Sequence, residues 1–216
     1  TLLLPKRDII PDLVTSGLDR VAVRIPAHPL TLELLSILNF PLAAPSANPF
    51  GYISPTKAEH VNAQLGDQIP YILDGGECKV GIESTIVGFE NGVATVYRLG
   101  GLSVDDIEKV IGKVNVLPHS SSNPQAPGML KSHYAPRKPF FIRSKEEMAL
   151  APEGVAALLF EKKVSNPNIY QKVLSESGDI KEAAHHLFTY LRELDAMNIQ
   201  EIWAEFVPTH GLGLAI

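Results

Sequence analysis

The chain has 216 residues, 45% of them hydrophobic and 20% charged, a balance typical of a globular protein with one large or two modest domains. The formal net charge of −5 argues against a strongly electropositive nucleic-acid-binding surface, although a local basic patch stays open. A single cysteine, Cys78, cannot form an internal disulfide, and no apolar run is long enough to cross a membrane. We therefore expect a cytoplasmic protein without a membrane segment.

The first 50 residues predict strands and a helix in alternation. Residues 1–5 and 20–26 are apolar runs with strand character, and residues 28–39 have leucines at helical spacing. Residues 41–48, PLAAPSAN, predict a short buried strand that ends in a polar loop. This alternation is typical of an α/β fold.

A second helix is expected directly after this loop. Ser54 is a candidate N-cap and Pro55 would occupy the first helical position, where proline is favoured. Gly66 would end the helix, and residues 71–76, YILDGG, predict a strand followed by a turn.

A β-hairpin and a capped helix complete this part of the chain. Residues 84–101 contain two β-rich runs around Asn91-Gly92, a strong hairpin signal. Residues 103–112 begin with serine and have an acidic first turn, which predicts a helix. Hairpin and parallel-type strands therefore mix, and we expect a mixed, twisted sheet with helices.

Residues 113–139 predict a linker, because their Pro-, Ser- and Asn-rich sequence has neither a period of two nor one of 3.6. The linker carries His133 and Tyr134, which a purely flexible spacer does not need. Three apolar runs and two helical patterns follow in β-α-β-α-β order, namely strands at 140–143, 155–162 and 201–208 and helices at 144–150 and 178–198. We expect domains at 1–112 and 140–216, the second a small Rossmann-like parallel α/β domain.

Polar side chains gather around the loop after residues 41–45. Ser46 and Asn48 would lie at the carboxyl end of a buried strand, where open α/β sheets bind ligands, and Ser54 would open a helix that favours an anion. A serine hydroxyl and a carboxamide can bond a phosphate, a ribose or a purine edge. On this loop alone, a simple turn with a helix cap is slightly favoured.

Two arginines change that balance. Arg24 and Arg98 each end an apolar strand, and a guanidinium there suits phosphate because its planar fork gives paired hydrogen bonds. The alternative is that they pair with nearby carboxylates such as Asp19 or Glu83. Two such arginines together with a helix-start site favour a nucleotide.

Other polar motifs carry weaker signals. Ser84 and Thr85 stand at a strand start and could hold a small polar substrate. His185 and His186 lie on an amphipathic helix, where packing explains them better than a metal site. Residues 73–76, LDGG, lack the lysine of a P-loop and the glycine spacing of a dinucleotide fold.

Six motifs in order resemble the long form of the threonylcarbamoyl-AMP synthase family. They are RVAVRIPAHP, PLAAPSANPFGYISPT, ILDGG, GIESTIV, YRLGG and APGMLKSHYAP. The resemblance covers the first 140 residues, and THGLGLAI matches at the end of the chain. It implies a YrdC-like domain joined to a smaller C-terminal domain by a linker with the HYAP motif.

The resemblance implies that L-threonine, bicarbonate and ATP are converted to L-threonylcarbamoyl-adenylate and pyrophosphate, with Mg²⁺ accompanying ATP. Other proteins would then move the carbamoyl group to position 37 of certain tRNAs, and direct tRNA binding is only weakly supported. Such chemistry needs charge neutralisation and positioning more than a covalent nucleophile.

The same resemblance assigns roles to residues of this chain. Arg24, Ser46 and Asn48 would be catalytic. The ATP site would comprise Ser46, Asn48, Ser54, Arg98, Tyr134 and Thr1, with Tyr134 folded back from the linker. The threonine site would comprise Arg24, Ala44 and Ser84, and no metal-ligating residue is assigned.

Two departures and two alternatives remain. Both ends of the chain interrupt predicted elements, and the family's Lys-x-Arg motif, expected upstream of Thr1, is absent. We therefore expect a fragment whose own activity is in doubt. The alternatives are a carbamoyl-adenylate-forming domain like those of hydrogenase-maturation carbamoyltransferases, and a non-catalytic RNA-binding module.

Overall fold

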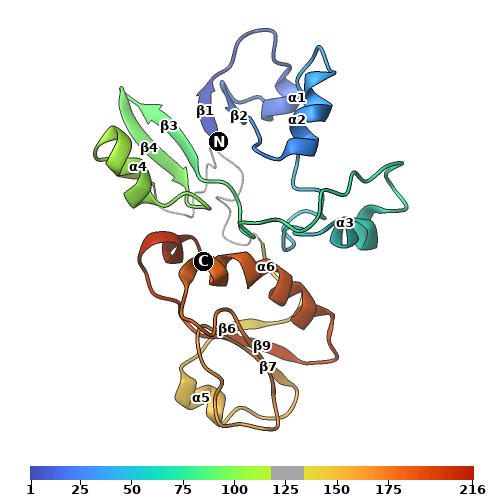
Figure 1. Ribbon diagram of the computed structural model, residues 1–216, viewed down its shortest axis with the longest axis vertical. Coiled ribbons are helices and arrows are strands. Elements are labelled where there is room, and N and C mark those ends of the chain that lie inside the picture. Colours follow the sequence, from blue (N-terminus) through green and yellow to red (C-terminus); the bar gives the residue numbers. More distant parts are fainter. Residues whose placement is uncertain (118–133) are drawn as a thin grey trace.

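A computed structural model describes residues 1–117 and 134–216, which form two lobes, each built on its own sheet (Figure 1). The first sheet contains β1 (Leu2–Pro5), β2 (Arg20–Val23), β3 (Ile86–Glu90), β4 (Val93–Arg98) and β5 (Asn115–Val116). Its helices are α1 (Asp12–Thr15), α2 (Pro29–Ser36), α3 (Ala58–Leu65) and α4 (Val104–Ile111). The second lobe contains β6 (Phe140–Ile142), α5 (Lys145–Ala149), β7 (Val155–Leu159), β8 (Tyr170–Val173), α6 (Ile180–Ala196), β9 (Glu201–Ala204) and the 3₁₀ helix η1 (Gly211–Ala215).

The first sheet is mixed, as the sequence predicts. Its order is β2-β1-β3-β4-β5, in which β1 pairs antiparallel with β2 and parallel with β3. The predicted hairpin is β3–β4, and its turn residues Asn91 and Gly92 both have positive φ, which a two-residue hairpin turn requires. β5 pairs parallel with β4, so the start of the predicted linker belongs to this sheet.

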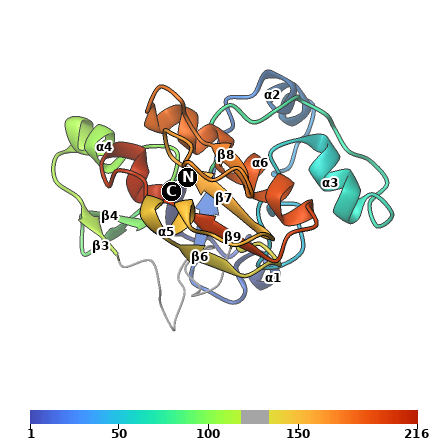
Figure 2. The same ribbon diagram turned by 90° about the horizontal axis from the view of Figure 1, so that it is seen from below.

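The second sheet is fully parallel, with the order β6-β9-β7-β8 (Figure 2). Every residue of β7 is buried, because its side chains alternate between two apolar clusters. Ala156 and Leu158 face the cluster that includes α6, whereas Val155, Ala157 and Leu159 join Met148 of α5. The predicted small parallel α/β unit is therefore confirmed, with β8 as a strand that the sequence did not indicate.

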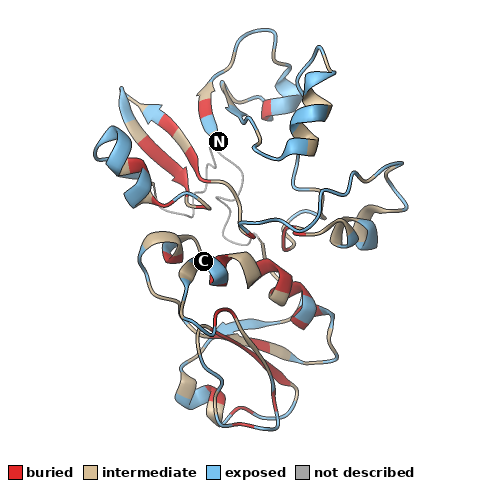
Figure 3. Ribbon diagram, viewed as in Figure 1, coloured by how far each residue is buried: buried red, intermediate tan, exposed pale blue. Residues whose placement is uncertain are grey.

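Burial differs between the lobes (Figure 3). The second lobe has two apolar clusters, while the first sheet buries a small one around Leu3, Ile86 and Tyr97. Helix α2 has no buried residue, and residues 41–46 are exposed. Most of the buried apolar residues of the described chain therefore lie in the C-terminal half.

Three local predictions are wrong. Residues 41–48 and 71–76 form no strand, and most of their side chains are exposed. The prolines at 41 and 45 have no N–H to give to a ladder, which disfavours a central strand there. Helix α3 begins at Ala58 after Lys57, so Ser54 is not its N-cap and does not present a helix start to an anion.

Tyr52 joins the lobes through its phenol, which donates to Asp195 Oδ2 of α6 at 2.7 Å. Burial, followed by this hydrogen bond, raises the pKa of Tyr52 to about 12 from the usual 10.0. The folded protein therefore holds this proton more tightly than the unfolded chain does. The associated stability is complete below about pH 10 and is lost as the pH rises toward 12.

We predict that Tyr52→Phe flattens the alkaline loss of stability. Urea unfolding should show that the free energy of unfolding of the wild type falls more steeply than that of the variant above about pH 10. Tyr71→Phe is the control, since Tyr71 is 88% exposed. Equal slopes for wild type and Tyr52→Phe would contradict the assignment.

Candidate functional site

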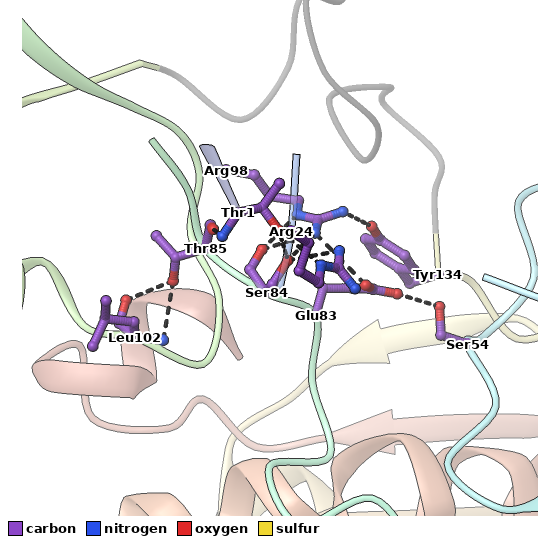
Figure 4. Close-up of polar contacts among 9 residues, drawn as sticks. All are labelled: Thr1, Arg24, Ser54, Glu83, Ser84, Thr85, Arg98, Leu102 and Tyr134. Carbon is purple, nitrogen blue, oxygen red and sulfur yellow. Dashed lines mark hydrogen bonds and ion pairs between the residues drawn. The ribbon is translucent and has the colours of Figure 1, made fainter. Parts of the chain in front are cut away.

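Arg98, at the end of β4, is the centre of a polar network between the lobes (Figure 4). Its side chain is buried, and Nε and Nη2 donate to the carbonyl oxygen of Ser84 at 3.0 and 2.8 Å. Nη2 lies 3.6 Å from Glu83 Oε2, and Nη1 donates to the phenol oxygen of Tyr134 at 3.1 Å. One guanidinium thus connects the first sheet with the segment that enters the second lobe.

Arg24 approaches the same place from the segment after β2. Its Nε donates to Thr1 Oγ1 and its Nη2 to Ser84 Oγ, both at 3.0 Å. The two hydroxyls are 2.6 Å apart, and Arg98 Nη2 also donates to Ser84 Oγ at 3.1 Å. Ser84 therefore lies between two guanidinium groups.

Glu83 supplies the carboxylate of this network. Ser54 donates to Glu83 Oε1 at 2.6 Å, while Glu83 Oε2 faces Arg98. The alternative that Arg98 pairs with Glu83 is therefore confirmed. With Arg24 added, two positive groups still stand against one carboxylate, and this excess suits an anionic ligand.

The backbone around Ser84 is fixed by its neighbours. Thr85 donates to the carbonyl of Leu102 at 2.6 Å and accepts from the Leu102 amide at 3.0 Å. Gly100 packs against this turn so closely that a Cβ would lie 2.3 Å from the carbonyl oxygen of Glu83. The YRLGG motif therefore has a structural reason, which is to let the residue 83–85 segment lie against the end of β4.

Tyr134 reaches the network from the HYAP motif, of which His133 lies outside the described residues. Its φ of 60° is left-handed, an uncommon conformation for an aromatic residue. Its ring is 5.6 Å from that of Phe188 on α6, and burial raises the pKa of the phenol, which keeps it neutral and able to hydrogen-bond. Tyr134 therefore contacts Arg98 and α6, while its predicted place on the nucleotide stays a prediction.

Ser46, Asn48 and Ala44 lie apart from these contacts. Asn48 Nδ2 donates to the carbonyls of Pro49 and Tyr52 at 2.9 and 3.0 Å, while Ser46 and Ala44 are exposed. The carboxamide oxygen of Asn48 is buried without a hydrogen-bond partner among the described residues. Their assignment to a nucleotide and threonine site stays a prediction.

A cavity of about 360 Å³ adjoins Arg98 between the lobes. Its lining includes the polar residues Glu83, Arg98 and Tyr134 and, from α6, the apolar residues Phe188 and Leu191. One face of the network therefore borders a partly open cavity that is large enough for part of a ligand.

The histidine pair has the structural explanation that the sequence favours. Within residues 1–117 and 134–216, no group of three or more His, Cys, Asp or Glu side chains could hold a metal ion. His185 and His186 instead place Nδ1 against the carbonyls of Lys79 and Leu174, at 3.1 and 2.8 Å.

Among the helices of residues 1–117 and 134–216, none has the length and the hydropathy of a membrane span.

Sequence reasoning missed Glu83 as a member of the site and saw it only as a candidate partner for arginine. Its position directly before Ser84 was the available signal. It also missed Arg192 and Asp195, charged residues at buried positions of α6. Their signal was their spacing from Phe188, which they follow by four and seven residues, so that all three share one side of the helix.

The two sheets and the convergence of Arg24 and Arg98 on Ser84 define an α/β protein of two lobes with a candidate site for an anion. Sequence profiles agree: one described as "Telomere recombination" matches residues 1–100, and one described as "Threonylcarbamoyl-AMP synthase, C-terminal domain" matches residues 102–216. The threonylcarbamoyl-AMP synthase of Pyrococcus abyssi is 38% identical over 100% of this chain and 67% of its own length. That of Bacillus subtilis is 37% identical over 100% and 66%.

A solved structure shows the same fold. The crystal structure of P. abyssi Sua5 complexed with L-threonine superimposes with a TM-score of 0.89 and 35% identity, over 99% of this chain and 66% of that one. This chain belongs to the threonylcarbamoyl-AMP synthase family. It spans about two thirds of the length of the relatives that it matches.

We predict that Glu83→Gln destabilises the protein by about 1–3 kcal/mol, because it removes the carboxylate that neutralises the buried Arg98. Urea unfolding measures the change. Glu161→Gln, which alters an exposed pair with Lys162, is the control and should cost less than about 0.5 kcal/mol. Equal effects of the two substitutions would show that the Glu83–Arg98 pair contributes nothing specific.

Proposed function

We propose that this chain is the catalytic part of a synthase that makes L-threonylcarbamoyl-adenylate and pyrophosphate from L-threonine, bicarbonate and ATP. The observation that carries the proposal is the convergence of Arg24 and Arg98 on Ser84, beside Tyr134 and a partly open cavity. The relatives' name and the L-threonine in the related crystal structure support the same activity. The product would serve threonylcarbamoylation of position 37 in tRNA through other transfer proteins.

The chemistry has two steps. The threonine amine attacks the carbon of bicarbonate, and loss of water leaves a carbamate. A carbamate oxygen then attacks the α-phosphorus of ATP, and the bond from that phosphorus to the pyrophosphate oxygen breaks. The protein's task is to hold threonine, bicarbonate and ATP together and to neutralise the charge that moves onto pyrophosphate.

Each site residue has a role in this scheme. Arg24 and Ser84 would hold the threonine, with the backbone at Ala44 beside it. Thr1, Ser46, Asn48, Ser54, Arg98 and Tyr134 would hold ATP. The carboxamide oxygen of Asn48, which has no hydrogen-bond partner among residues 1–117 and 134–216, supports this role, because it can accept a hydrogen bond from a nucleotide.

Magnesium would accompany ATP on its phosphates. Glu83 is the carboxylate of the described network, and Ser54 and Arg98 already occupy its oxygens. This donor set does not fit a dedicated magnesium cage, which needs several free oxygens. We therefore assign no residue to the metal.

The two alternatives differ in support. The C-terminal-domain profile over residues 102–216 favours the synthase over a hydrogenase-maturation carbamoyltransferase. For RNA binding, the net charge of −5 argues against tight contacts with phosphates. Direct tRNA binding and a cytoplasmic location stay predictions.

The activity is tested with the full-length gene product. ATP consumption and adenylate formation are measured with L-threonine and bicarbonate each omitted in turn. We expect turnover only when all three substrates are present. Turnover that needs neither threonine nor bicarbonate would overturn the proposal.

Ser46→Ala and Asn48→Ala should each weaken ATP binding about 5- to 30-fold, because each removes hydrogen bonds to the nucleotide. Calorimetric titration measures the affinity. Ser165→Ala and Asn198→Ala, at exposed positions of the second lobe, are the matched controls. Unchanged ATP affinity in both site variants would show that this loop is a turn without a role in ATP binding.

A further inference from the structure

The two segments that carry Ser54 and Glu83–Ser84 belong to neither helix nor strand. Residues 51–56 and 77–84 therefore depend on contacts from elsewhere for their positions. They touch each other through the Cys78 amide, which donates to the carbonyl of Thr56 at 2.9 Å, and through the Ser54–Glu83 hydrogen bond. Both segments lie against helix α6 of the second lobe (Figure 1).

Arg192 of α6 holds the Ser54 backbone directly. Its side chain is buried, and the guanidinium donates to the carbonyls of Ile53 and Ser54 and to Gln64 Oε1, the last at 2.9 Å. The guanidinium also lies 5.0 Å from the centre of the Tyr52 ring. A buried charge is costly unless its N–H groups have hydrogen-bond partners. The Arg192 guanidinium therefore requires the carbonyls of Ile53 and Ser54 to stay in place.

Asp195, one turn further along α6, joins the same segment to the one that carries Tyr134. Its Oδ2 accepts from the Tyr52 phenol, and its Oδ1 accepts from the amides of Arg137 and Lys138 at 2.8 and 3.0 Å. Ile53 adds a fully buried side chain to the apolar cluster of the second lobe. The residues around Ser54 are thus part of the C-terminal packing.

The first turns of α6 hold the Glu83 segment. His185 Nδ1 meets the carbonyl of Lys79, and a Cβ at Gly81 would lie 2.2 Å from the carbonyl oxygen of His185. Gly81 has a φ of +81°, so both its conformation and its contact require glycine. Thr189 lies on α6 between His185 and Arg192, and its Oγ1 is 2.8 Å from Thr56 Oγ1.

These contacts follow one face of the helix. Four residues of α6 make them, spaced by four, three and three positions: His185, Thr189, Arg192 and Asp195. In that order they contact residues 79–81, residue 56, residues 53–54 and residue 52. A rigid helix therefore sets the separation of the two irregular segments.

We propose that α6 of the C-terminal domain positions the two irregular segments of the substrate site. Arg192 is a positioning residue: it holds Ser54 against Glu83, and Glu83 in turn pairs with Arg98. This inference rests on the proposed function, because it assigns Ser54 and Arg98 to ATP. It gives the C-terminal domain a part in forming the site, although α6 itself need not touch the reacting atoms.

A double-mutant cycle in the full-length gene product tests the proposal. Calorimetry measures the affinity for the non-hydrolysable analogue α,β-methylene-ATP in the wild type, Arg192→Lys, Ser54→Ala and the double variant. Each protein is measured at a temperature below its own midpoint of thermal unfolding. We expect about a tenfold loss in each single variant and no further loss in the double variant, because Arg192 acts through Ser54. Arg143→Lys is the control, since Arg143 is an arginine of the same domain that pairs with Glu147.

Additive losses, or an unchanged affinity in Arg192→Lys, would overturn the positioning role. Hydrogen exchange on the ligand-free protein separates this outcome from failure of the proposed function. We expect Arg192→Lys to speed exchange at residues 52–56 and to leave β3 and β4 unchanged. If the wild type binds neither the analogue nor L-threonine, the proposed function fails, and the exchange result still decides whether Arg192 holds the segment.

Discussion

The structure depends on the buried guanidinium of Arg98. A charged group that is 7% exposed must find partners, since its desolvation is expensive. Those partners are Ser84, Glu83 and Tyr134, which come from a turn before β3 and from the segment that follows the undescribed residues. One side chain therefore requires the first sheet, the residue 83–85 turn and the entry to the second lobe to be in place together.

The C-terminal half contains most of the buried apolar residues of the described chain. Its parallel sheet is covered on both faces, whereas α2 and residues 41–46 of the first lobe bury little. Helix α6 packs on that sheet with one face and meets residues 52–56 and 79–81 with its other contacts. This arrangement explains why an irregular polar segment can keep a defined position beside the arginines.

The elements that could be predicted from sequence are those with local signals. Asn91-Gly92 forms the expected hairpin turn, and Ser103 caps α4, the helix that its serine and acidic first turn predict. Strand β8 gave no such signal, because YQKV has neither an apolar run nor alternation and is fixed by pairing with β7. Residues 41–48 misled for the opposite reason: they are apolar but pair with no described strand.

The site was predicted in part. The family resemblance assigns Arg24 and Ser84 to threonine and Arg98 to ATP, and the structure brings the three side chains into contact, since each lies at or next to the end of a strand of the same sheet. Ser54 was assigned the wrong local role, because its real partner, Glu83, is 29 residues away in the chain. The spacing of Arg192 and Asp195 on α6 indicates that both are buried, but it does not indicate their partners, which lie in the first lobe.

The central claim is that the Arg98 network binds the nucleotide, and the affinity of Arg98→Lys for ATP tests it most directly. Lysine keeps the positive charge but loses the planar fork that bonds Ser84, Glu83 and Tyr134 at once. With Arg20→Lys as the control, because Arg20 pairs with Glu90 on the same sheet, calorimetry should show about a tenfold or greater loss for Arg98→Lys alone. Equal ATP affinity in the wild type and Arg98→Lys would contradict the account.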